Sequence, residues 1–130
     1  MDMSLKTHIS LPFEEAVSAT RDALAEQGFG VLTEIDVKAT MKAKLDKDVG
    51  SFLILGACNP PLAYQAISAQ ASIGVLLPCN VVVRQDGDEV LVEAVDPTGM
   101  MSIAGDASLD AVASEATDRL RAALGSLAAA

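Results

Sequence analysis

The chain has 130 residues, enough for one domain with a single core, and 51% of them are hydrophobic while only 3% are aromatic. Its formal net charge of −9 argues against nucleic acid or an anionic membrane surface as a partner, because both are bound through Lys and Arg. No apolar run approaches the ~20 residues that span a bilayer, and the N-terminus lacks the apolar segment of a secretory signal. Since two cysteines are too few for a disulfide framework, we expect residues 1–130 to form one cytoplasmic domain with reduced thiols.

The first half of the chain alternates strand and helix signals. Apolar and polar residues alternate over 5–10, which predicts a half-buried strand. Helical spacing with a proline at the start predicts a helix over about 12–27. Alternation resumes over 29–37 and predicts a strand whose odd-numbered residues share the buried face. Apolar residues four apart then favour a short amphipathic helix over about 37–47.

The second half begins with a short apolar run at 52–57, which predicts an interior strand covered on both faces. Asn59 is a good N-cap residue, and Pro60-Pro61 opens a helix behind it. Strands follow at about 79–84 and 90–95, joined by a hairpin turn at Asp86-Gly87.

Residues 96–101 contain proline and glycine and are predicted to form a loop. A continuous apolar stripe from Leu109 to Leu127 then predicts the last helix, with Ser108 as its cap.

The order of these elements is β-α-β-(α)-β-α-β-β-α. Because it includes a hairpin, the sheet cannot be purely parallel. We predict an α+β two-layer sandwich: one mixed or antiparallel sheet of about five strands with the longer helices on one face. The other face would be exposed unless a second copy covers it, which favours a homodimer.

The two cysteines, each followed by asparagine, stand at predicted element boundaries. Cys58 precedes the Asn59-capped helix, where backbone N–H groups and the helix dipole stabilise a thiolate. The alternative is a small buried hydrophobe. Cys79 follows Pro78 at the start of a strand, about 20 residues away, so the pair is no local C-x-x-C motif. If they meet in space, a disulfide, a shared ligand and a free thiol pair all remain open.

The sequence offers few candidate ligands for a metal ion and few candidate catalytic residues. Structural zinc needs four ligands, and the chain offers two cysteines and His8, so that Asp96 or a second copy would have to complete the site. We therefore expect no metal and no cofactor. A cysteine nucleophile needs a histidine base, and His8 on the polar side of the first strand is the only candidate. This makes an enzyme the less favoured class.

One combination of motifs resembles a known family. Gly56-Ala57-Cys58-Asn59-Pro60 and Leu76-Leu77-Pro78-Cys79-Asn80, followed by Asp96-Pro97 and Met100, are similar to the domain of unknown function 302 family. The resemblance spans nearly the whole chain. It implies a compact α+β domain that tends to form homodimers, and no established activity. It places the family's motif positions on Cys58, Asn59, Pro60, Cys79, Asn80, Asp96 and Pro97.

The leading hypothesis is a homodimer with a small-molecule or redox-sensing pocket around Cys58. Helix N–H groups would hold an anionic or polar ligand, Asn59 would cap the helix, and Cys79 with Asn80 would form the facing wall. Asp96 completes the candidate ligand-binding residues. The competing hypothesis is a structural or protein-interaction module with packing cysteines, and the third is a cysteine-dependent enzyme.

Overall fold

The computed structural model describes residues 4–128 of the chain. They contain a five-stranded sheet in the order β1-β5-β4-β3-β2, in which every neighbouring pair is antiparallel. The strands are β1 (Ser4–Ile9), β2 (Gly30–Asp36), β3 (Phe52–Cys58), β4 (Cys79–Asp86) and β5 (Glu89–Val95). The predicted α+β sandwich with five strands is confirmed, and the sheet is antiparallel throughout.

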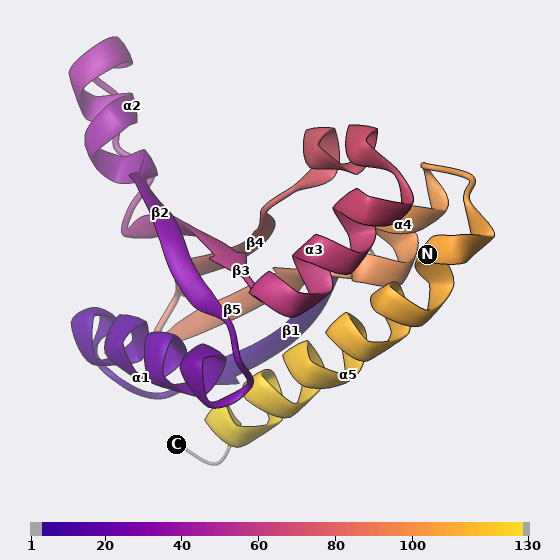
Figure 1. The fold of residues 1–130 in the computed structure, drawn as a ribbon. Helices are drawn as coiled ribbons and strands as arrows, with labels where there is room; N and C mark the ends of the chain where they lie inside the picture. The colour runs from indigo at the N-terminus through magenta and orange to yellow at the C-terminus, as the bar shows by residue number, and fades with distance from the viewer. Residues whose placement is uncertain (1–3, 129–130) are drawn as a thin grey trace.

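Helices α1 (Phe13–Glu26) and α5 (Asp110–Leu127) lie together against one face of this sheet (Figure 1). The remaining helices are α2 (Val37–Leu45), α3 (Pro60–Ala69) and α4 (Pro97–Ser102), with 3₁₀ turns η1 (Ala71–Leu76) and η2 (Ala107–Leu109). They lie at the margins of the sheet, so in the described part of the chain the opposite face is open. Among residues 4–128, none of the helices has the length and apolar character needed to cross a membrane.

The buried residues form two clusters. The larger one lies between the sheet and helices α1 and α5, and Leu55, Val81 and Leu120 are fully buried in it. The smaller one joins α3, η1 and α4 to the N-terminal half of α5, around Leu109 and Ile73. Helix α5 contributes to both clusters because its apolar stripe continues along its whole length.

Strand β2 departs from the predicted alternation. Val31 pairs with Ala57 and Thr33 pairs with Gly56, so Leu32 is an extra residue, a β-bulge. The bulge turns Thr33 and Ile35 to the face opposite Val31, and the prediction that they share one face is wrong. Helix α2 follows and projects away from the α1–α5 layer (Figure 1). None of its residues is buried.

Three smaller predictions also need correction. Residues 97–102 form helix α4, because Asp96 caps it and Pro97 occupies its first turn. Ser108 is not the cap of α5: it lies in η2, which Asp106 caps. Strand β3 is interior but not covered on both faces, since Ile54 on the open side is only half-buried.

Candidate functional site

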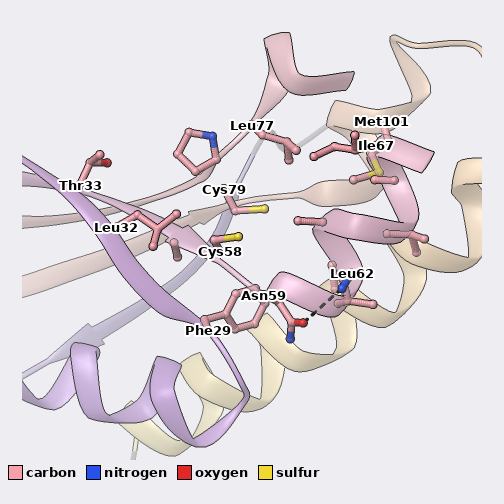
Figure 2. Close-up of a pocket in the computed structure, with 16 residues that line it drawn as sticks. Phe29, Leu32, Thr33, Cys58, Asn59, Leu62, Ile67, Leu77, Cys79 and Met101 are labelled. Carbon is pink, nitrogen blue, oxygen red and sulfur yellow. Dashed lines mark hydrogen bonds between the residues drawn. The ribbon is translucent and has the colours of Figure 1, made fainter. Parts of the chain in front are cut away.

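A cavity of about 340 Å³ opens where β3 ends and β4 begins (Figure 2). Its other walls come from the start of β2 and from helices α3, α4 and α5. The wall contains residues of both buried clusters: Phe29 and Ala57 from the larger one, and Leu62, Met101 and Val112 from the smaller one. The cavity is therefore the space left where the two clusters meet.

The structure brings the two cysteines together in this cavity. Cys58 is the last residue of β3 and Cys79 the first of β4, and Ala57 is the register partner of Cys79. Both sulfurs point into the cavity in Figure 2, and both thiols are free. No disulfide joins Cys58 and Cys79 in this structure.

The two thiols have different surroundings. Cys79 is buried, with 7% of its surface exposed, whereas Cys58 is partly exposed. Burial, and secondly electrostatic repulsion from the nearby Cys58, raise the pKa of Cys79 to about 11.

Asn59 forms the junction between β3 and α3. It is 8% exposed, its side-chain oxygen accepts a hydrogen bond from the Leu62 N–H, and its amide nitrogen donates to the Gln27 carbonyl. The predicted N-cap is confirmed. Because both ends of its amide are occupied, Asn59 fixes the helix start and the end of α1 rather than offering a free polar group to the cavity.

The start of α3 offers no free N–H group to an anion, contrary to the sequence hypothesis. Its first two residues are Pro60 and Pro61, which have no N–H, and the next N–H, of Leu62, is already bonded to Asn59. Apart from the two cysteines, no acidic, basic or histidine side chain in residues 4–128 lines the cavity. Its chemistry is apolar, with two thiols and the Thr33 hydroxyl as additional groups.

The other two candidate residues lie outside the cavity lining. Asn80 is exposed, because successive residues of a strand face opposite sides and Cys79 points inward. Asp96 caps α4, where its carboxylate accepts bonds from the Thr98 N–H at 3.0 Å and hydroxyl at 2.5 Å. The Thr98 hydroxyl is the main cause that keeps the pKa of Asp96 below its ordinary value of 3.8. Its hydrogen bonds identify Asp96 as a structural cap.

Most cavity residues were not identified as site residues from the sequence. Leu62, Ala66, Val112 and Ala116 belong to helical apolar stripes, and a stripe predicts burial without saying whether the buried face meets protein or empty space. Met101 was assigned to a loop, although the Asp96-Pro97 pair was a usable signal for a helix start there.

The described part of the chain forms neither a cluster of three or more metal ligands nor a cysteine–histidine catalytic pair. No group of three or more His, Cys, Asp and Glu side chains in residues 4–128 could hold a metal ion. His8 lies on the open face of the sheet, 3.1 Å from the Asp86 carboxylate, and does not line the cavity. It is therefore not placed to act as a base for Cys58.

Comparison with known proteins gives one family. The family model described as "Domain of unknown function DUF302" matches residues 5–127. The chain is similar to the crystal structure of an uncharacterized conserved protein DUF302 from Bacillus stearothermophilus, with 25% sequence identity and a TM-score of 0.92. That match covers 98% of this chain and 99% of the other. No curated protein matched.

Proposed function

The chain belongs to the domain of unknown function 302 family, and we propose that it binds a small apolar molecule in the cavity beside Cys58 and Cys79. One observation carries this proposal: an open cavity of about 340 Å³ that is lined almost entirely by carbon and sulfur. Ligand sites in proteins are typically concave, mostly apolar and roughly 300–1,000 Å³ in volume. Such a cavity lowers the stability of a short chain, because the atoms that line it lose van der Waals contacts on one side.

The walls favour an uncharged ligand. Burying a charge without a partner is strongly unfavourable, and the lining offers neither an ion-pair partner nor a free helix N–H. The thiols add a redox response to the same cavity. An external disulfide could oxidise them, with loss of two protons and two electrons, to a bond that ties β3 to β4 at the cavity wall.

Binding of an uncharged fluorescent dye, N-phenyl-1-naphthylamine, tests the proposal. Ala116 faces the cavity and Ala111 is exposed on the same helix, so Ala116→Leu and Ala111→Leu are a matched pair. We expect Ala116→Leu to weaken dye binding by about tenfold or more, because the added carbons occupy the cavity, and Ala111→Leu to leave it unchanged. Equal dye binding by both folded variants would refute the proposal.

A specific observation also favours an interaction surface, and we propose that the chain is a homodimer through it. Residues 37–49, the arm, comprise α2 and the loop behind it. The arm holds four of the nine basic residues of the chain and two of the 18 acidic ones, so its net charge is +2 and the remainder carries −11. Leu45 and Val49 on the arm are 62% and 48% exposed. A basic, apolar arm on an acidic body is complementary to a second copy of the same chain.

Sedimentation over a range of protein concentrations tests the dimer. Leu45→Ser removes an exposed apolar side chain from the arm, and Ile103→Ser removes one that is 75% exposed elsewhere. We expect the first to raise the dissociation constant by about tenfold and the second to leave it unchanged. A monomeric wild-type chain would exclude the dimer, and equal dissociation constants for the two variants would exclude the arm.

We further propose a cytoplasmic protein without nucleic-acid or membrane partners. Two reduced thiols side by side suit a reducing compartment. The net charge of −9 opposes binding to phosphate-rich surfaces.

A further inference from the structure

We propose that Cys58 and Cys79 bind one soft monovalent metal ion, of the class of Cu(I), between their two sulfurs. The site occupies the thiol end of the cavity. It goes beyond the proposed small-molecule site, because it requires only the thiol pair and not an organic ligand in the remaining space.

The first argument is geometric. Cys58 ends β3 and Cys79 begins β4, two hydrogen-bonded strands, and the register partner of Cys79 is Ala57, the residue before Cys58. Both sulfurs project into the same cavity (Figure 2). Cys58 is partly exposed, so an ion can enter from solvent and reach the buried Cys79 behind it.

The second argument is the number and kind of ligands. Zinc requires four ligands, and calcium six to eight oxygens, and neither set exists around these thiols in residues 4–128. A filled-shell monovalent ion such as Cu(I) is satisfied by two thiolates in a linear arrangement, and soft sulfur ligands select it over harder ions. The scarcity of ligands that excludes zinc therefore favours this class.

The third argument concerns charge. On binding, each thiol releases its proton to solvent and two sulfur–metal bonds form, so the complex of two thiolates and one monovalent cation has a net charge of −1. Asn59, the N-cap of α3, follows Cys58, so the thiol lies near the positive end of the dipole of this ten-residue helix.

A third sulfur provides an internal control. Met101 also lines the cavity, but from α4 on the opposite wall in Figure 2. The site as proposed does not use this thioether. Met101→Leu keeps the apolar volume and removes only the sulfur. It therefore distinguishes metal binding by the two thiols from metal binding by any sulfur atom in the cavity.

The test is an anaerobic titration of the reduced full chain with Cu(I) in competition with the chromophoric chelator bicinchoninate. We expect one ion per chain. Cys58→Ser and Cys79→Ser should each weaken binding by about 100-fold, and Met101→Leu should change it by less than about threefold. Zinc at equal concentration should not displace the copper.

Three results would overturn the site: no transfer of copper from the chelator, one ion bound between two chains, or wild-type affinity in either serine variant. Since a serine at buried position 79 can impair folding, Cys79→Ala and X-ray absorption of the copper-loaded wild type provide a second route. Absorption should show two sulfur neighbours; nitrogen or oxygen neighbours alone would contradict the site. The dye experiment reads a separate property, so its failure would leave this site standing, and the reverse holds as well.

Discussion

At the scale of single residues, the main result is that Cys58 and Cys79 share a cavity but differ in protection. Cys58 ends a strand at the cavity mouth and is partly exposed, whereas Cys79 is buried beneath it. Reactivity of a thiol requires both access and the thiolate form. The pair therefore combines one accessible thiol with one that is held protonated by its surroundings.

This difference predicts an order of alkylation. With its pKa raised to about 11, only roughly one Cys79 side chain in a thousand is a thiolate at about pH 8. We expect iodoacetamide to label Cys58 well before Cys79 in the native chain, as measured by peptide mass spectrometry. In urea the two should react at similar rates. Equal labelling of both in the native protein would mean that Cys79 is not buried as described.

Gly56 is the second residue whose identity the structure explains. A Cβ built on it would lie 2.9 Å from Cγ of Pro78 and would also collide with the Thr33 hydroxyl. The neighbouring proline ring is rigid, so the backbone itself would have to move. Gly56 thus allows β2, β3 and the start of β4 to approach closely at the edge of the cavity.

Gly56→Ala should therefore lower the free energy of unfolding by about 1–3 kcal/mol, the usual cost of overpacking. Gly30→Ala is the matched control, because a Cβ there meets nothing within 4 Å and the strand is the next one in the sheet. It should change stability by less than about 0.5 kcal/mol. Urea denaturation of both variants measures the difference. A neutral Gly56→Ala would show that the sheet edge can relax.

At the scale of single residues, the sequence predicts local interactions but not contacts between residues that are far apart in the chain. Asn59 was predicted as a cap because its side chain acts on a backbone N–H three residues away, a local interaction. The constraint on Gly56 comes from Thr33 and Pro78, both more than 20 positions distant, and periodicity carries no information about it. The role of Pro60-Pro61 in removing N–H donors was readable from the sequence, and the hypothesis of an anion site overlooked it.

At the scale of elements, local signals predicted strands and helices well except where one residue changes the pattern. The extra residue Leu32 turns the second half of β2 over, so Ile35 reaches the open face. A bulge is set by the register with β3 and leaves no trace in the hydrophobic alternation of β2 itself. The same bulge places the 69%-exposed Leu32 at the cavity mouth, so the error in the strand prediction hid a site residue.

Helix α4 gives a prediction about pH. The pKa of Asp96 is held below 3.8 in the fold, chiefly by the Thr98 hydroxyl, so its charged form stabilises the native state. That contribution is complete above the ordinary pKa and is lost as pH falls through the lowered one. Asp96→Asn keeps a capping side chain but cannot ionise. It should cost about 0.5 kcal/mol at neutral pH, and the difference from wild type should vanish in acid.

Thermal unfolding of both proteins between about pH 7 and pH 2 measures this difference. Asp22→Asn, at an exposed position in the middle of α1, is the control for replacing a carboxylate by an amide away from a helix start. A difference between wild type and Asp96→Asn that stays constant down to the lowest pH would show that the carboxylate at the start of α4 does not stabilise the fold.

At the scale of the whole molecule, the order of elements was sufficient to predict the layers. The sequence predicts a hairpin between β4 and β5 and two long helices, α1 and α5. This combination favours one sheet with a helical face, and the structure has this arrangement. The cavity could not be predicted in the same way. It depends on how far the cluster around α3 and α4 stands from the cluster under the sheet, a result of tertiary packing that no single segment specifies.

We expect the two clusters to unfold as one cooperative unit, because α5 contributes residues to both of them. Leu55 belongs to the sheet cluster and Leu109 to the other, and both side chains are fully buried. Each Leu→Ala change should cost about 2–5 kcal/mol. If the clusters fold together, each variant should show one unfolding transition for the whole chain, with a midpoint below that of the wild type.

Two probes separate the clusters. The chain has one tyrosine, Tyr64, which is 69% exposed on α3, and no tryptophan. Tyrosine fluorescence therefore reports on α3, which contributes to the smaller cluster, while far-UV circular dichroism reports the whole fold. At one fixed protein concentration, the two probes should give the same urea midpoint for wild type, Leu55→Ala and Leu109→Ala. If Leu109→Ala lowers only the fluorescence midpoint, α3 and α4 open independently of the sheet. The cavity would then be the boundary between two folding units, and its volume would vary with the opening of one of them.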